Sequence, residues 1–325
     1  MPTIFITRAI SESGIDKLKK AGYEVDINPD DRVLGKDELI NSLKNKKYDA
    51  VLCLLTDKID RDIFEAVGTQ CKIFANYAVG YDNIDINTAK EKNILITNTP
   101  GVLTETVAEH TFALMLAISH RIAEADRFTK NGNYKGWEPT LLLGNDLSHK
   151  TVGIVGAGRI GSRVAYHASR GFDANIIYYD IKRNEEFEKE TGARYCETLD
   201  NLLGEADYVS IHVPLLPQTK HLINKDKFSL MKKSAYLINT SRGPVIDEEA
   251  LVVALKTKAI RGAALDVFED EPRLKEGLSA QDNVILTPHI ASGTEETRSK
   301  MSEMAANNII SALNGETPPQ LVNVQ

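Results

Sequence analysis

The fold of this 325-residue chain is decided by the stretch Val152-Gly153-Ile154-Val155-Gly156-Ala157-Gly158-Arg159-Ile160-Gly161. Here an apolar run ends in a turn whose glycines follow the pattern G-x-G-x-x-G, and a helix-compatible segment comes next. Gly156 permits the tight turn, Gly158 lets a pyrophosphate approach the backbone, and Gly161 lets the helix pack close to the strand. The N–H groups at the start of that helix would face the pyrophosphate with partial positive charge. The stretch therefore predicts a dinucleotide site, the alternative being a purely structural turn.

A second predicted strand strengthens this interpretation. Asn175–Tyr179 ends in Asp180, about 20 residues after the last glycine, where an acidic side chain accepts hydrogen bonds from the adenosine ribose. The charge of Asp180 would repel a 2′-phosphate, whereas Lys182 and Arg183 would attract one. We therefore expect NAD(H) to be the preferred cofactor and NADP(H) to be the alternative.

The composition is that of an ordinary globular protein, with 42% hydrophobic and 26% charged residues. A net charge of −7 argues against a nucleic-acid binder, which would show a basic face. The absence of a long apolar run or a signal-peptide pattern leads us to expect no membrane segment. The three scattered cysteines, Cys53, Cys71 and Cys196, suggest neither disulfides nor a metal site and are typical of a cytoplasmic protein.

Short apolar runs alternate with amphipathic helical patterns along the chain, which predicts parallel sheets built from βαβ units. In the first hundred residues the expected strands are 3–7, 24–28, 50–55, 72–75 and 94–97, and the expected helices are 12–21, 36–44, 60–67 and 85–91. After the breaker cluster Asn98–Gly101 we expect one long apolar helix, Leu103–Lys130, buried between domains or subunits. An irregular segment with Trp137, the only tryptophan, follows it. Further strands are expected at 208–213, 235–239, 262–267 and 283–287, and a last helix at 295–314.

Three later segments carry candidate chemistry because each follows a predicted strand, where ligands bind in open α/β sheets. Arg242 has the planar side chain that suits a carboxylate. A cluster of four carboxylates, Asp266 and 269–271, comes after the next strand, and the residues alone do not distinguish Glu269 from Glu271. His289 follows a third strand directly after a proline. A general acid and a carboxylate-binding group are thus expected at one sheet edge.

Taken together, these segments resemble the D-isomer-specific 2-hydroxyacid dehydrogenases over essentially the whole chain. The resemblance rests on residues 75–85, 156–161, 239–247, 262–272 and 287–291 in this order. Within the family, the loop at 76–80, the Trp137 segment and the ending at 318–323 are most similar to glyoxylate and hydroxypyruvate reductases. The implied fold is α/β, with two doubly wound parallel-sheet domains. A Rossmann dinucleotide-binding domain, residues 100–290, would be inserted into a flavodoxin-like substrate-binding domain, residues 1–99 and 291–325.

The resemblance also assigns roles to residues, and it selects the glutamate that precedes Pro272. The implied catalytic residues are Arg242, Glu271 and His289. The implied cofactor-binding residues are Thr106, Gly156, Gly158, Arg159, Ile160, Gly161, Asp180, Val213, Pro214, Thr219, Thr240, Asp266 and Ser292. The implied substrate-binding residues are Leu55, Tyr77, Val79, Gly80, Arg242 and His289.

The function implied is hydride transfer between NAD(P)H and a small 2-oxo acid to give a D-2-hydroxy acid, with glyoxylate or hydroxypyruvate as the expected substrate. The alternatives are a D-lactate or aryl-lactate dehydrogenase and a 3-phosphoglycerate dehydrogenase-like enzyme, although near residues 55–58 only Lys58 is evident as a cation for a phosphate. A more remote alternative is a non-catalytic NAD(H)-sensing corepressor. We expect a homodimer, with Trp137 either in the partner's active site or in the dimer core.

Overall fold

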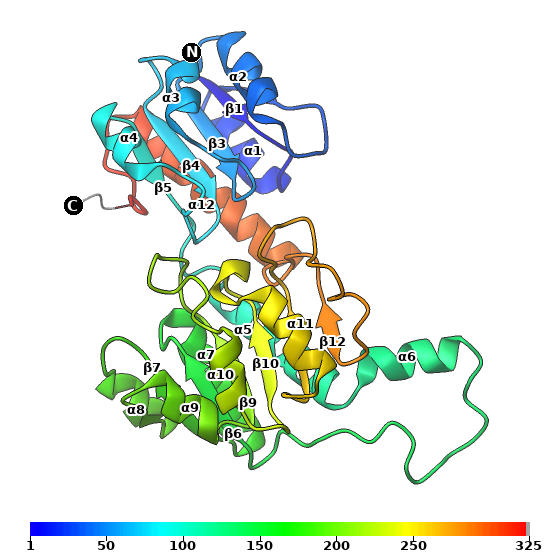
Figure 1. Cartoon of the computed structure of the whole chain (residues 1–325). Helices are drawn as coiled ribbons and strands as arrows, with labels where there is room; N and C mark the ends of the chain where they lie inside the picture. Colours follow the sequence, from blue (N-terminus) through cyan, green and yellow to red (C-terminus); the bar gives the residue numbers. More distant parts are fainter. Residues whose placement is uncertain (323–325) are drawn as a thin grey trace. The chain divides into compact units, whose positions relative to one another are not determined.

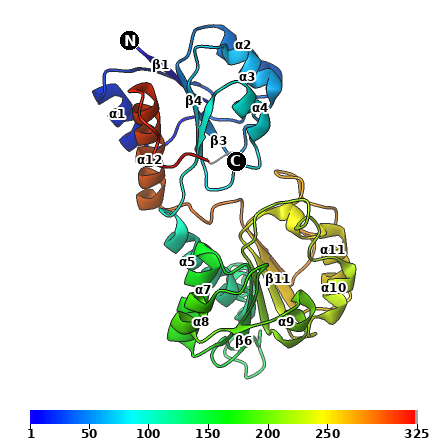
Figure 2. The same ribbon diagram turned by 90° about the vertical axis from the view of Figure 1, so that its left-hand side faces the viewer.

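The computed structural model describes residues 1–322, and these form two units, Met1–Leu103 with the segment from Gly293 onward, and Thr104–Ser292. Each unit is a parallel sheet with helices on both faces (Figure 2). Within residues 1–322, no helix is both long enough and apolar enough to cross a membrane. Asn323 of the ending that supports the family resemblance lies outside the described residues.

The first unit has a five-stranded sheet in the order β2-β1-β3-β4-β5, which is the flavodoxin-like order. Its strands are β1 (Thr3–Ile6), β2 (Glu24–Ile27), β3 (Ala50–Leu54), β4 (Ile73–Tyr77) and β5 (Leu95–Thr97). Its helices are α1 (Glu12–Lys20), α2 (Lys36–Lys44), α3 (Arg61–Val67), α4 (Ile86–Glu91) and α12 (Glu295–Leu313). Helices α1 and α12 cover one face, and α2, α3 and α4 cover the other (Figure 2). Strands β1, β3 and β4 are almost wholly buried, which explains why they appear as apolar runs, whereas the edge strand β2 is partly exposed.

The second unit has a seven-stranded parallel sheet in the order β12-β11-β10-β9-β6-β7-β8. Its strands are β6 (Thr151–Val155), β7 (Asn175–Tyr179), β8 (Arg194–Tyr195), β9 (Tyr208–Ile211), β10 (Tyr236–Asn239), β11 (Gly262–Leu265) and β12 (Val284–Leu286). Its helices are α5 (Thr104–Ser119), α6 (Ile122–Lys130), α7 (Arg159–Phe172), α8 (Glu185–Thr191), α9 (Leu199–Glu205), α10 (Lys225–Leu230) and α11 (Glu248–Lys256), with a short 3-10 turn at Gly243–Val245. The strand order reverses between β6 and β9, and doubly wound sheets bind ligands at such a point.

The expectation of one helix from Leu103 to Lys130 was wrong. The helix breaks at Arg121, whose backbone is left-handed with φ 57°, and α6 then starts in a new direction. The Arg121 guanidinium holds the first turn of α6 by bonding Glu124 at 2.6 and 2.7 Å. The apolar residues that suggested a buried helix all lie in α5, whereas α6 has no buried residue. Figure 1 shows α6 and the loop after it extending away from the rest of this unit.

Candidate active site

The glycine turn lies at the carboxyl end of β6, and its three glycines are required for different reasons. A Cβ on Gly156 would lie 2.9 Å from the His212 backbone, and the φ of Gly156 is +97°. A Cβ on Gly161 would lie 2.1 Å from the Gly156 carbonyl oxygen. A Cβ on Gly158 would meet nothing within 4 Å. Close contacts within the protein therefore explain Gly156 and Gly161. The space beside Gly158 is open, as the approach of a pyrophosphate to the backbone requires.

Helix α7 begins directly after this open space, and its N-cap is Gly158, which has no side chain to occupy the first N–H groups. The turn is closed from the next strand, because the Ala157 N–H donates to Asp180 Oδ2 at 2.8 Å. Asp180 follows β7, as the sequence predicted. The open backbone, the helix N-terminus and this carboxylate fit the pyrophosphate and adenosine ribose of a dinucleotide.

Three candidate site residues of this unit, the catalytic candidates Arg242 and His289 and the cofactor candidate Asp266, follow three neighbouring strands. Arg242 comes after β10, Asp266 directly after β11, and His289 after β12. Because these strands are parallel, all three residues lie at the same sheet edge as the glycine turn. The Arg242 side chain donates from Nη1 to the Ser241 carbonyl oxygen at 2.8 Å, and Asn239 Nδ2 donates to the Arg242 carbonyl oxygen at 2.9 Å.

His289 and Glu271 form a pair, with His289 Nδ1 2.8 Å from Glu271 Oε2. The other carboxylate oxygen of Glu271 accepts the Phe268 N–H at 2.9 Å, so the carboxylate is held from both sides. The two side chains are 26% and 30% exposed, which leaves the imidazole accessible. His289 has a φ of +53°, a conformation that costs energy for a non-glycine residue and that accumulates at functional sites. The pair has the geometry of an oriented general acid.

The Asp266 side chain accepts several hydrogen bonds from the loop that carries His289. Its fully buried carboxylate accepts hydrogen bonds from Thr287 Oγ1 at 2.6 Å and from the N–H groups of Ile290 and Ala291 at 2.9 and 2.7 Å. His110 Nε2 lies 3.5 Å from the same carboxylate. Burial disfavours the charged form, but these donors outweigh it and lower the pKa of Asp266. The carboxylate is thus used by the protein itself, and it fixes the backbone on both sides of His289.

His110 and Thr287 were missed by the sequence analysis. His110 lies on α5 and approaches Thr287 Oγ1 at 3.3 Å, while Thr111 Oγ1 lies 2.9 Å from Thr240 Oγ1. Helix α5 is thereby tied to the residues that follow β10 and β12. The sequence offers little signal for His110, because α5 carries other polar residues, Glu105 and Glu109 among them.

The remaining predicted cofactor residues of this unit lie on loops or first turns. Val213 and Pro214 follow β9, and Thr219 closes their loop by donating to the Pro214 carbonyl oxygen at 2.6 Å. Thr106 lies in the first turn of α5, next to Glu105, which bonds Arg163 of α7. The others are Arg159 and Ile160 in the first turn of α7, and Ser292 at the end of the His289 loop.

In the first unit, the predicted substrate residues lie around the carboxyl ends of β3 and β4. Leu55 directly follows β3 and is partly exposed. Tyr77 is buried, and its hydroxyl donates to the Arg298 carbonyl oxygen at 2.6 Å, so its side chain packs within the unit. The turn after it is held by its carbonyl groups, because Asn98 Nδ2 donates to Val79 O at 2.7 Å and Asn76 Nδ2 to Gly80 O at 2.9 Å. The carbonyl oxygens of this turn are therefore occupied by side chains of the same unit.

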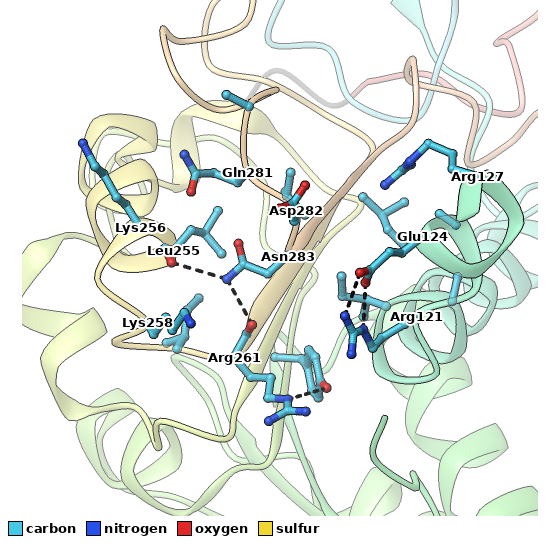
Figure 3. A pocket seen from close by; sticks show the side chains of 18 of the residues that line it. Arg121, Glu124, Arg127, Leu255, Lys256, Lys258, Arg261, Gln281, Asp282 and Asn283 are labelled. Atoms are coloured by element: carbon cyan, nitrogen blue, oxygen red, sulfur yellow. Dashed lines mark hydrogen bonds and ion pairs between the residues drawn. The ribbon is translucent and has the colours of Figure 1, made fainter. Parts of the chain in front are cut away.

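A hollow of about 500 Å³ lies away from this chemistry, at the amino ends of β10, β11 and β12 and beside α6 (Figure 3). Its wall is rich in cations, and the Arg121 side chain is turned toward Glu124 (Figure 3). The basic side chains that line it are Arg121, Arg127, Lys233, Lys256, Lys258 and Arg261. Since parallel strands bind ligands at their carboxyl ends, this hollow is not the candidate active site. In the part of the chain that the structure describes, no cluster of His, Cys, Asp and Glu could hold a metal ion.

Comparison with known proteins finds relatives that span almost the whole chain. Residues 112–291 match the family described as D-isomer specific 2-hydroxyacid dehydrogenase, NAD binding domain. Glyoxylate reductase of Korarchaeum cryptofilum is 48% identical over 99% of this chain and 96% of its own. Glyoxylate reductase of Thermococcus litoralis is also 48% identical, over 99% and 97%. The solved structure of an NADPH-dependent glyoxylate/hydroxypyruvate reductase from Sinorhizobium meliloti, in complex with NADP and malonate, is 30% identical and covers 99% of this chain and 96% of its own with a TM-score of 0.85.

Proposed function

We propose that this chain, which belongs to the D-isomer specific 2-hydroxyacid dehydrogenase family, reduces a small 2-oxo acid to a D-2-hydroxy acid. Members of this family are NAD(P)-dependent oxidoreductases. The observation that carries the proposal is the His289–Glu271 pair at the sheet edge that also holds the open glycine turn. The relatives named above favour glyoxylate or hydroxypyruvate as the substrate.

In the proposed mechanism His289 is the general acid. Glu271 holds Nδ1 and stabilises the imidazolium, so that Nε2 is the nitrogen that donates a proton to the carbonyl oxygen of the substrate. The nicotinamide, when bound, supplies the hydride that adds to the carbonyl carbon. Arg242 binds the substrate carboxylate and polarises the carbonyl group. After reduction His289 is neutral and regains its proton from solvent, and in the oxidative direction it acts as the base.

The second unit is proposed as the cofactor domain. The pyrophosphate would lie on the glycine turn and the first turn of α7, and Asp180 would accept hydrogen bonds from the adenosine ribose. The other proposed cofactor contacts come from Thr106, Arg159, Ile160, Val213, Pro214, Thr219, Thr240 and Ser292. For Asp266 we propose an indirect contribution, because its buried carboxylate already accepts three hydrogen bonds.

NAD(H) is the proposed preference over NADP(H). Asp180 places a carboxylate beside the turn, where it would repel a 2′-phosphate. Arg183, which would attract that phosphate, is held by Glu188 through two hydrogen bonds of 2.8 Å each. A bidentate pair of this kind leaves the guanidinium less available to a ligand.

The first unit is proposed to bind the substrate. The N–H groups of Val79 and Gly80 would donate hydrogen bonds to the substrate carboxylate, and Leu55 would lie near the far end of the substrate. For Tyr77 the buried side chain favours a role in shaping this turn.

We further propose a homodimer formed through the arm, defined here as residues 120–146. The arm exposes four large apolar side chains, Ile122, Tyr134, Trp137 and Leu143, and Trp137 is 81% exposed. Exposed apolar groups concentrated on one segment are typical of an interaction site. Light scattering of the wild type and of Trp137→Ala would test this, and a monomeric wild type would contradict it.

The proposed function is tested by initial rates with glyoxylate, hydroxypyruvate, pyruvate and phenylpyruvate, each with NADH and with NADPH. Fast turnover of glyoxylate or hydroxypyruvate with NADH supports the proposal. A preference for pyruvate or phenylpyruvate would move the chain to the lactate or aryl-lactate branch. NADH binding without turnover of any of these acids would refute the proposed reaction.

A further inference from the structure

Glu248 is a buried carboxylate that the proposed mechanism does not use. It is the first residue of α11, and although such a position is usually solvated, its side chain is only 1% exposed. Oε1 accepts the Glu269 N–H at 2.6 Å, and Oε2 is buried with no partner among residues 1–322. A buried polar atom without a partner costs free energy, so its persistence calls for a reason.

The bond from Glu269 attaches Glu248 to the loop that orients the general acid. In this loop, Phe268–Glu271, two successive N–H groups are held by two different carboxylates. The Phe268 N–H donates to Glu271 Oε1, and the Glu269 N–H donates to Glu248 Oε1. Glu271 in turn bonds His289 through its other oxygen. The position of the Glu271 carboxylate therefore depends on a loop backbone that Glu248 anchors.

Glu248 also lies a few residues after Arg242, and the segment between them contacts the same loop. A Cβ on Gly243 would lie 1.9 Å from the carbonyl carbon and oxygen of Phe268, so the two backbones are in direct contact. The segment from Arg242 to Glu248 thus meets the loop at two points, one steric and one hydrogen-bonded. Together these contacts fix the position of Arg242 relative to the carboxylate of Glu271, which bonds His289.

The charges around Glu248 make this anchor sensitive to protonation. The carboxylates of Glu269 and Asp270 face it from the loop, and Lys275 lies 2.8 Å from Asp270 and 3.8 Å from Glu269. His221 pairs with Glu269 at 2.7 Å. Burial, and after it the charges of Glu269 and Asp270, raise the pKa of Glu248 to about 7. The hydrogen bond from the Glu269 N–H and the charge of Lys275 act in the opposite direction but are weaker. Ionisation would add a third negative charge to this group.

We propose that Glu248 is a positioning residue whose neutral form holds the Phe268–Glu271 loop, and through it Glu271 and His289, in the arrangement that reduction requires. Ionisation of Glu248 repels Glu269 and Asp270, loosens the loop and lowers kcat. The inference rests on the proposed function, because it concerns the loop behind the proposed general acid.

The test compares Glu248→Gln, Glu248→Ala and the control Glu249→Gln, a neighbour on α11 that is exposed. We measure kcat and KM for glyoxylate from pH 5.5 to 9, and NADH affinity by fluorescence. Glu248→Gln keeps an acceptor for Glu269 but cannot ionise, so the high-kcat plateau should extend to higher pH than in the wild type. Glu248→Ala should lower kcat at every pH by ~10–100-fold with NADH affinity unchanged, because small displacements of reacting groups are costly. Glu249→Gln should match the wild type.

Identical kcat profiles for the wild type and Glu248→Gln would overturn the inference. So would equal losses of NADH affinity and kcat in Glu248→Ala, which would indicate a merely structural role. The backbone amide resonance of Glu269, whose N–H donates to Glu248, provides a readout without turnover. It should shift near neutral pH in the wild type and lose that shift in Glu248→Gln, and an unchanged shift would also overturn the inference. An inactive wild type with this shift present would refute the proposed reaction but not the role of Glu248.

Discussion

Replacing Glu248 by glutamine should raise the free energy of unfolding relative to the wild type by an amount that grows as pH rises. The pKa of this carboxyl is raised from 4.5 to about 7, so the folded protein holds the proton more tightly than the unfolded chain does. Below pH 4.5 both states are protonated and nothing is lost. Between pH 4.5 and 7 the unfolded chain gives up its proton first, so the stability of the wild type falls as pH rises. Above pH 7 the loss is complete.

The size of the effect follows from the two pKa values. Their difference of about 2.5 units (7 − 4.5), at 1.36 kcal/mol per unit, corresponds to about 3 kcal/mol. Glutamine escapes this loss because it carries no charge. Burying the amide group of glutamine costs the same free energy at every pH. The difference in free energy of unfolding between the two proteins therefore changes with pH only because Glu248 ionises. Partial screening by solvent makes about 3 kcal/mol an upper value for this change.

The assay is urea unfolding followed by far-UV circular dichroism from pH 5 to 8.5. Fluorescence is a poor readout here, since the only tryptophan, Trp137, is 81% exposed in the folded protein. The free energy of unfolding of Glu248→Gln should rise relative to the wild type across this range, and the exposed control Glu249→Gln should show no such trend. Parallel curves for the wild type and Glu248→Gln would refute the reasoning from buried charge.

Four further substitutions test the site. His289→Asn should lower kcat by ~10²–10⁴-fold while NADH affinity, measured by fluorescence titration, stays unchanged; loss of NADH binding as well would contradict the assignment of His289 as the acid. Gly243→Ala should destabilise the protein by about 1–3 kcal/mol in urea unfolding and lower kcat, because its Cβ would lie 1.9 Å from Phe268 backbone atoms. The control Gly204→Ala, whose Cβ would meet only Leu230 O at 3.9 Å, should be neutral or stabilising, and equal effects of the two changes would argue against the steric explanation. Asp180→Ala should raise kcat/KM for NADPH relative to NADH, and an unchanged ratio would show that the carboxylate does not discriminate between the cofactors. Asp266→Asn should lower both kcat and the urea midpoint, since the charge that accepts the Thr287, Ile290 and Ala291 donors is lost; wild-type values of both would refute its role in holding the His289 loop.

Local sequence features were enough for the fold class and for the residues that follow the strands. Glycine spacing and apolar runs are short-range signals, because turn geometry and burial act on neighbouring residues. For this reason Gly156, Gly161 and Asp180 lie where the sequence predicted, after β6 and β7. The same signals were misleading at the end of α5, because they predicted a single helix that continued through Arg121 into α6. Nothing in a periodicity count marks a single residue with left-handed backbone.

By itself, the sequence determined the parallel α/β architecture, the dinucleotide turn and the presence of Arg242 and His289 after strands, since each depends on spacing along the chain. Only the tertiary structure decided which groups meet. It paired His289 with Glu271 and directed Glu269 instead toward His221, a choice that the carboxylate cluster left open. It also brought His110 to Asp266 and Glu248 to the Glu269 N–H. These contacts join segments far apart in the chain, because parallel strands carry their following loops to one edge of the sheet and helix α5 packs against residues there.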